Sequence, residues 1–284
     1  MADIRIISRR IKSIKNIAKI TKAMEMVAAS KMKRAQERGL AGRPYSEKIQ
    51  QVIADLAALH EVELQHPLLQ RRPVTKIVIV HITPDRGLCG GLNANINRRT
   101  VNFILEQSVP ATLIAVGRKG RDFMRRYGRD IYAEFTQLGD QPSLIDTLPI
   151  SHIVVDDYSK GAIDLVYLAY SQFVSTVLQR PVLQQLLPVE PARIFQEQNV
   201  DYIYEPDSDV VLGEILPRFV EMQVYHAIME AIASEQSARM VAMRSATDNA
   251  NELMGDLTLL YNKARQEAIT KELLDIAGGA AALD

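Results

Sequence analysis

The sequence predicts an α/β protein whose two termini form a long antiparallel two-helix coiled coil, with a small Rossmann-like parallel-sheet domain between them. Three observations support this. Ten of the twelve prolines lie between residues 67 and 206, and residues 1–38 contain neither proline nor glycine, so long helices are permitted only at the ends. Apolar residues recur with helical spacing at both ends, and strand-like and helix-like segments alternate in the middle. We therefore expect a discontinuous shaft, residues 1–60 and 208–284, and a globular domain, residues 73–205.

The carboxy-terminal segment carries the stronger helical signal. Steps of three and four residues from Leu212 to Ala268 meet 17 positions, of which 14 are apolar; the exceptions are His226, Gln236 and Thr247. A seven-residue repeat held this long is typical of a coiled coil. Gly255 is the one glycine between residues 214 and 277, and Pro217 is expected to kink the start of this helix.

The amino-terminal segment supplies a partner for that helix. Isoleucines 4, 7, 11 and 14, and then apolar residues to Val27, form one stripe with a single slip, and the chain is expected to bend or loosen at Gly39, Gly42 and Pro44. At about 1.5 Å per residue the two helices would be about 80 and 100 Å long, more than a compact domain holds. They should therefore pair with each other, and antiparallel, because a domain lies between them.

The middle of the chain alternates between strand and helix patterns. Strands are expected at 76–82, 111–116, 131–135, 165–174 and 181–187, and helices after Asn93 to Gln107 and at 118–127. Residues 151–158 fit either a strand or a helix. This order predicts a small, mostly parallel sheet with helices on its faces.

Charge is distributed unevenly although 34 basic and 34 acidic side chains cancel. Residues 1–50 contain 13 Lys or Arg against 4 Asp or Glu, whereas residues 208–284 contain 6 against 12. The two ends could attract each other or face different partners. No apolar run is long enough to predict a transmembrane segment. The single cysteine, Cys89, excludes an internal disulfide and a cysteine zinc site.

The turn Gly87–Gly91 is the one candidate for ligand chemistry, because it joins a strand to a helix, where nucleotide folds bind phosphate. It lacks the lysine and hydroxyl of a P-loop, and no acidic residue follows the second strand at Val116 to grip a ribose. A structural turn is favoured. The five histidines show no ligand spacing, and no nucleophile–base pattern is found. The sequence predicts no catalytic residue, no cofactor and no metal.

Four segments together resemble the gamma subunit of F-type ATP synthase, in its bacterial form. They are spread over the whole chain, in order, and are long enough to be specific: residues 17–32 (IAKITKAMEMVAASKM), 85–93 (DRGLCGGLN), 234–250 (SEQSARMVAMRSATDNA) and 261–272 (YNKARQEAITKE). No insert with paired cysteines is present, which argues against the thiol-regulated chloroplast form.

The resemblance implies a rotor that is not an enzyme by itself. In that family the coiled coil is the central stalk, which couples proton-driven rotation of the c-ring to conformational cycling of the catalytic sites on the beta subunits. The implied partners are the alpha, beta, epsilon and c-ring subunits, without nucleic acid, a transmembrane segment or direct nucleotide binding. The implied location is peripheral, on the cytoplasmic face of the bacterial cell membrane. The tail from Ile276 would turn in an apolar collar.

The resemblance also implies contact residues. Basic side chains of the first helix would face acidic beta-subunit loops, and other positions match the family motifs, giving as rotor–stator contacts Lys22, Met24, Lys31, Lys33, Arg34, Arg239, Arg265, Gln266, Thr270 and Glu272. Tyr204 and Glu205 would contact the c-ring or epsilon at the foot. The alternative is that these side chains only pair across the coiled coil.

Two other functions fit parts of the sequence. One is a dinucleotide-binding enzyme with helical dimerisation arms, which would bind its cofactor at Gly87–Gly91. The other is a structural or nucleic-acid-binding protein using the basic end, which would bind DNA in a salt-sensitive way. A rotor should instead co-purify with other subunits and show no hydrolytic activity alone.

Overall fold

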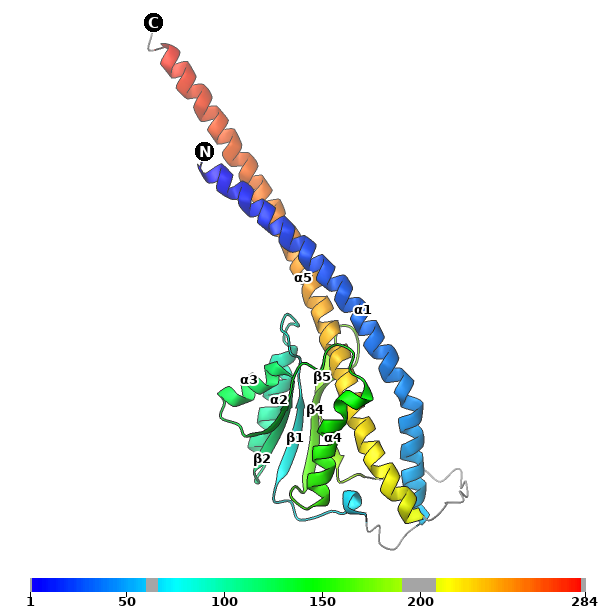
Figure 1. The fold of residues 1–284 in the computed structure, drawn as a ribbon. Helices are drawn as coiled ribbons and strands as arrows, with labels where there is room; N and C mark the ends of the chain where they lie inside the picture. The colour runs from blue at the N-terminus through cyan, green and yellow to red at the C-terminus, as the bar shows by residue number, and fades with distance from the viewer. Residues whose placement is uncertain (1, 60–65, 191–207, 282–284) are drawn as a thin grey trace. The chain divides into compact units, whose positions relative to one another are not determined.

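A computed structural model of the chain describes residues 2–59, 66–190 and 208–281. The chain divides into two compact units: residues 1–28 with 239–284, called here the helix-pair unit, and residues 29–238, called the globular unit. Two long helices, α1 (Ala2–Leu59) and α5 (Ser208–Ala281), contribute to both units (Figure 1). Their continuity confirms the prediction of long terminal helices.

The globular unit is built on one five-stranded sheet. Its strands are β1 (Ile77–Ile82), β2 (Ala111–Val116), β3 (Ile131–Phe135), β4 (Leu165–Phe173) and β5 (Gln179–Leu187), in the order β3-β2-β1-β4-β5. The first four strands are parallel, and β5 pairs with β4 antiparallel. Each of the five predicted strands is present to within two residues at either end, and the predicted mostly parallel sheet is confirmed.

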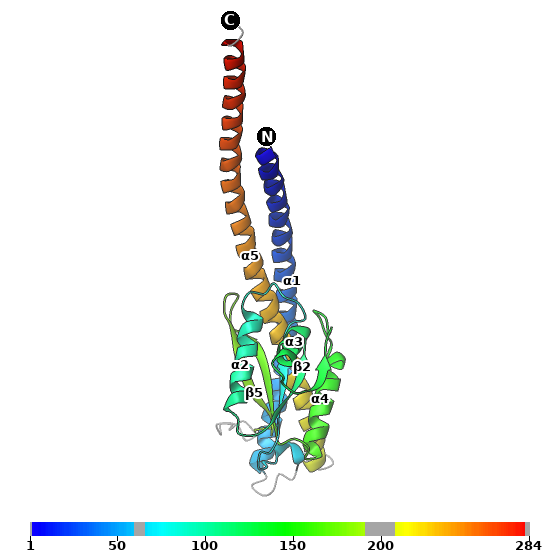
Figure 2. The same ribbon diagram turned by 90° about the vertical axis from the view of Figure 1, so that its left-hand side faces the viewer.

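Helices cover both faces of this sheet (Figures 1 and 2). Helices α2 (Leu92–Glu106) and α3 (Arg118–Arg126) lie on one face, whereas α4 (Leu144–Ser159) and the first part of α5 lie on the other. Alternate residues of β1 therefore enter different cores: Ile77 and Ile79 pack with α2 and α3, and Val78 and Val80 pack with α4 and α5. All six residues of β1 are buried because the strand is central and covered on both faces.

The ambiguous segment 151–158 is helical and lies within α4. Its helix starts with a capping box, in which Ser143 and Asp146 satisfy each other's backbone N–H groups. Ile150, Val154 and Tyr158 then recur at a spacing of four and are buried in the core. The capping box that marks the start of this helix lies at residues 143–146, outside the segment 151–158. Residues 151–158 alone were too few to distinguish a strand from a helix.

The two prolines of the long helices do not end them. Pro44 lies inside α1, and Pro217 lies inside α5, which begins nine residues earlier, at Ser208. An interior proline costs about 3 kcal/mol in an isolated helix. In α5 the neighbouring Leu216, Phe219 and Val220 are buried in the core, and burying side chains of this size contributes about 1.5–3 kcal/mol each. Packing therefore outweighs the proline.

Candidate functional site

The helix-pair unit is antiparallel, as predicted, and its register is fixed by polar contacts. The hydroxyls of Thr21 and Thr247 are 2.7 Å apart, and both threonines are buried. One turn farther on, Arg244 Nε donates to Glu25 Oε1 at 3.0 Å. Residue numbers rise along α1 as they fall along α5, so the helices run in opposite directions. Ala18 and Ala250, both buried, extend the same seam.

Glu25 is the most constrained charge of this seam. Its side chain is only 7% exposed and accepts from Lys22 Nζ and from Arg244 Nε, both at 3.0 Å. The hydrogen bonds from Lys22 and Arg244 lower the pKa of the Glu25 carboxyl below its usual value and outweigh its desolvation. This carboxylate thus ties α1 to α5 as an ion, and Lys22, a predicted stator contact, binds the same carboxylate from within α1.

The last turns of α5 are exposed within the helix-pair unit. The register through Thr21 and Thr247 places the start of α1 near residue 266 of α5, so the turns beyond have no α1 residue opposite them (Figures 1 and 2). These turns nevertheless carry large apolar side chains, with exposures of 63% for Leu273, 67% for Leu274 and 70% for Ile276. Exposed apolar side chains gathered in this way mark an interaction site.

The predicted stator contacts of this unit differ in exposure. Four lie on exposed positions of α5: Arg265, Gln266, Thr270 and Glu272. Met24 is half-buried, and Arg239 is only 9% exposed. The first group is accessible to another subunit, whereas Arg239 is largely enclosed by its own chain.

The remaining predicted contacts belong to the globular unit or to undescribed segments. Lys33 is exposed and 3.8 Å from Glu37, and Arg34 is exposed and donates to Ser30 Oγ at 3.1 Å. Lys31 is engaged inside the unit, where its Nζ lies 2.6 Å from Asp140 Oδ2. Tyr204 and Glu205 lie outside the described residues.

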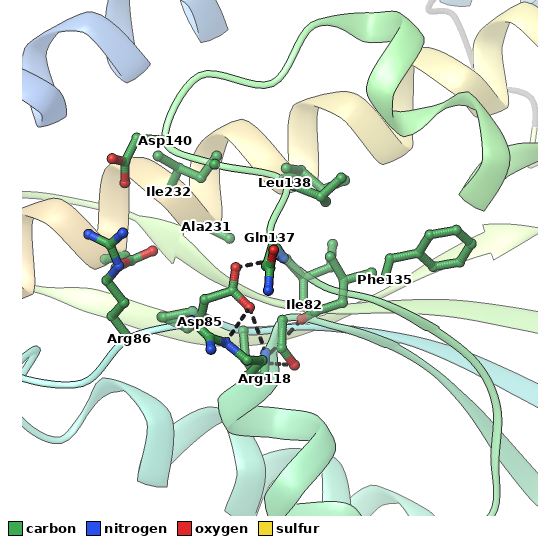
Figure 3. A pocket seen from close by; sticks show the side chains of 17 residues that line it. Ile82, Asp85, Arg86, Arg118, Phe135, Gln137, Leu138, Asp140, Ala231 and Ile232 are labelled. Atoms are coloured by element: carbon green, nitrogen blue, oxygen red, sulfur yellow. Dashed lines mark hydrogen bonds and ion pairs between the residues drawn. The ribbon is translucent and has the colours of Figure 1, made fainter.

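The globular unit has a cavity of about 280 Å³ at the carboxyl edge of its sheet (Figure 3). Ligands of open α/β folds bind at this edge. The cavity is lined by the ends of β1, β2 and β3, by the loop after β3 and by α5, from Ile228 to Glu235. The glycine turn Gly87–Gly91, which the sequence suggested as a ligand site, contributes no residue to the lining of this cavity.

A carboxylate of the chain itself occupies the anion position of this edge. Asp85 Oδ1 accepts from the backbone N–H of Arg118, the first residue of α3, at 2.9 Å (Figure 3). The next two N–H groups of α3 donate to the Pro84 carbonyl at 3.1 Å and to Thr83 Oγ1 at 2.8 Å. The first three N–H groups of α3 are therefore already engaged by acceptors of the chain itself.

Glycines allow this close approach of α3 to β1. A Cβ at Gly117, whose φ is +92°, would lie 1.8 Å from the Thr83 carbonyl oxygen. A Cβ at Gly120 would lie 2.6 Å from Thr83 Oγ1 and 2.7 Å from His81 Cδ2. Glycine is therefore required at both positions after β2, because any side chain there would clash with Thr83 or His81. The sequence alone did not indicate this requirement.

Neither a metal site nor a membrane span is found in the parts of the chain that the structure describes. No three His, Cys, Asp or Glu side chains there are placed to hold a metal ion. None of the described helices combines the length and hydropathy needed to cross a bilayer. Cys89 is buried beside Asn93, whose Nδ2 donates to Cys89 Sγ at 3.2 Å.

The fold and the helix pair define a class of protein: an α/β domain whose terminal helices continue into an antiparallel pair. The family model described as ATP synthase matches residues 3–283, and the chain belongs to that family. Curated relatives named ATP synthase gamma chain include one from Dehalococcoides mccartyi strain CBDB1, 68% identical over all of both chains. Another, from Roseiflexus sp. strain RS-1, is 53% identical over 100% of this chain and 99% of its own length.

Solved structures with a similar fold include parts of two mitochondrial ATP synthases. A chain of the Tetrahymena thermophila central stalk and c-ring structure matches with a TM-score of 0.60 and 26% identity, covering 80% of this chain and 99% of that one. A chain of the Euglena gracilis OSCP/F1/c-ring structure matches with a TM-score of 0.67 and 21% identity, covering 99% and 95%. The second likeness bears on the fold alone.

Proposed function

We propose that this chain is the central-stalk rotor of a bacterial ATP synthase, with residues 1–60 and 208–284 as the shaft and 73–205 as the foot. It is a non-catalytic subunit, and it couples proton-driven rotation of a membrane ring to the conformational cycle of catalytic sites on other subunits. The observation that carries this is a buried polar seam in an antiparallel helix pair whose far end exposes leucine and isoleucine side chains. Membership of the ATP synthase family supports it.

The surfaces of the chain support a proposal for the individual partner subunits. The apolar end of α5, with Leu273, Leu274 and Ile276, fits an apolar collar formed by the alpha and beta subunits, where small barriers permit turning. The exposed polar positions of α5 and the basic face of α1 fit acidic loops of the beta subunits, with ion pairs of about 0–1 kcal/mol that can break and re-form. The foot would meet the epsilon and c subunits, and the complex would place the chain peripherally at the cytoplasmic face of the membrane.

A nucleotide-binding enzyme is the less favoured hypothesis because, at the carboxyl edge of the sheet, Asp85 already accepts from the first N–H group of α3. The first N–H groups of α3 donate to acceptors of the chain itself, and the glycine turn 87–91 does not line the cavity. We therefore propose no direct nucleotide binding by this chain.

Rotation of the assembled complex tests the proposal. The chain is co-expressed with the alpha, beta and epsilon subunits of the same cells and carries two substitutions: Cys89→Ser removes the buried thiol, and Ser108→Cys adds an exposed one. A bead attached to the introduced thiol at position 108 of the surface-anchored complex should turn when ATP is added. A complex that hydrolyses ATP while the bead stays still would refute the proposal. The proposal would also be refuted if the alpha–beta complex purified from the co-expressing cells did not contain the chain.

Two charge reversals in the same assay test the proposed stator contacts. Arg265→Glu should reduce the turning rate or the force against which the bead turns, because it reverses a charge at a proposed contact. Lys263→Glu reverses a charge two residues away that is also exposed but is not a proposed contact, and should have little effect. Equal effects of the two variants would remove Arg265 from the contact surface.

A further inference from the structure

The loop after β3 joins the edge of the sheet to both long helices. Residues 136–141, called here the strap, leave β3 at Phe135 and lead to α4. The strap is held at its start by the loop that follows β1, because Asp85 Oδ2 accepts from the backbone N–H of Gln137 at 2.9 Å. Figure 3 shows Asp85 between Gln137 and Arg118, with Asp140 farther along the strap, beside Ile232 of α5.

A single carboxylate of the strap contacts both helices. Asp140 Oδ2 accepts from Lys31 Nζ of α1 at 2.6 Å, and Asp140 Oδ1 accepts from Gln236 Nε2 of α5 at 3.2 Å. The next residue adds a second tie to α1, because Arg38 Nη2 donates to Gln141 Oε1 at 2.8 Å. All these groups lie in the globular unit, just before both helices leave it at residues 28 and 239.

The two helices need this tie to different degrees. In the globular unit α5 buries a long apolar face in the core, from Leu212 to Ala233. Among the α1 side chains that the structure describes, Ala35, Ile49 and Ile53 belong to the buried part of that core. Because apolar burial is the main force that holds α5 to the sheet, α1 depends more on the polar contacts of the strap.

We propose that the strap fixes α1 and α5 together to the carboxyl edge of the sheet, and that Asp140 is the positioning residue of this joint. A turning force on the globular domain then reaches both helices at the same level, and α1 does not slip along α5. This inference rests on the proposed rotor function. It also gives Asp85, which lies at a position typical of a ligand-binding loop, the role of anchoring the strap to α3 and the sheet.

The size of the effect follows from the exposure of the ion pair. The side chains of Lys31 and Asp140 are 30% and 36% exposed, so the pair lies in the range of partly solvated salt bridges. Losing such a pair changes the equilibrium between α1 bound to the strap and α1 detached from it by about five-fold. The chain should therefore still fold and assemble without it, which keeps positioning separable from stability.

Hydrogen exchange of the purified full chain is the first test. Asp140→Ala should accelerate exchange of the α1 amides between residues 31 and 38 by about five-fold, while α5 amides between 212 and 228 keep the wild-type rate. Asp140→Glu should restore most of the protection, and Asp140→Asn should restore part of it, because its oxygen still accepts from Gln236. Asp122→Asn, which removes an exposed ion pair on α3, is the matched control. Unchanged exchange in α1 would overturn the proposal.

Proton pumping by the assembled complex in membrane vesicles is the second test. The protons pumped per ATP hydrolysed should fall in Asp140→Ala, with ATP hydrolysis kept, and should recover in Asp140→Glu. A faster-exchanging α1 with a wild-type pumping ratio would make the strap purely structural and refute the positioning role. A wild-type chain that neither assembles nor pumps would instead contradict the rotor function, so the two failures are distinguishable.

Discussion

Lowering the pH from 7.5 to 5 is predicted to destabilise the globular unit through His81 on the central strand. His81 has no exposed surface, and its ring nitrogens lie 2.8 Å from Asn97 Oδ1 and 3.1 Å from Thr100 Oγ1. Burial lowers the pKa of His81 to about 4, although its hydrogen bond with Asn97 acts in the opposite direction. The imidazole is therefore neutral in the folded protein at physiological pH.

The sign and size of the pH effect follow from this pKa. Between pH 6.5, the ordinary pKa of histidine, and pH 4 the unfolded chain binds a proton at His81 that the folded chain does not. The free energy of unfolding must then fall as the pH falls. Over the whole range the loss is about 3 kcal/mol, and at pH 5 it is about 2 kcal/mol.

Urea denaturation at pH 7.5, 6.5, 5.5 and 5 measures this loss. Nine of the ten tyrosines belong to residues 29–238, so near-ultraviolet circular dichroism of the full chain reports mainly on the globular unit. His81→Gln removes the titrating group, and His152→Gln changes an exposed histidine as a matched control. His66, whose pKa is also lowered by burial, is present in every protein and cancels in the comparison.

The wild-type chain and His152→Gln should lose stability with the same steep slope, whereas His81→Gln should start less stable at pH 7.5 and lose about 2 kcal/mol less on the way to pH 5. If His81→Gln loses as much as the wild type, the acid sensitivity comes from other groups. The assignment of a buried neutral imidazole to His81 would then be wrong.

Two further predictions concern packing. Thr21→Val or Thr247→Val alone should lower the free energy of unfolding of the helix pair by about 1 kcal/mol, because each leaves a buried hydroxyl without its interhelical partner, and the double variant should recover part of the loss; additive losses in a urea denaturation cycle would deny the contact. Gly120→Ala should destabilise the globular unit by about 1–3 kcal/mol, because its Cβ would lie within 2.7 Å of Thr83 and His81. In the same urea denaturation experiment Gly39→Ala is the control, because its Cβ would meet nothing within 4 Å, and it should stabilise by about 0.5–1 kcal/mol. Equal effects of the two variants would contradict the close approach of α3 to β1 at Gly120.

Several features of the helix pair could be read from the sequence because they are periodic. The heptad spacing predicted α5, and the isoleucine stripe predicted α1. Their antiparallel pairing followed from the length of the two helices and from the domain that lies between them in the sequence. One polar exception in the apolar repeat, Thr247, coincides with an interhelical contact, because its hydroxyl lies against that of Thr21. Glu25 gave no such signal, because a glutamate in a basic helix looks like any solvated charge until Arg244 is placed opposite it.

Local patterns along the chain were enough to predict most of the elements and their order, residues 151–158 of α4 being the exception. Hydrophobic periodicity and helix breakers act over a few residues, so five strands and two long terminal helices could be predicted without knowing their neighbours. The pairing of polar groups, in contrast, became visible only once the elements were packed against one another. Asp140 contacts Lys31 and Gln236, more than ninety residues away in either direction, and Asp85 fills an anion position made by α3. Such contacts depend on how separate elements pack in space, which no local pattern along the chain records.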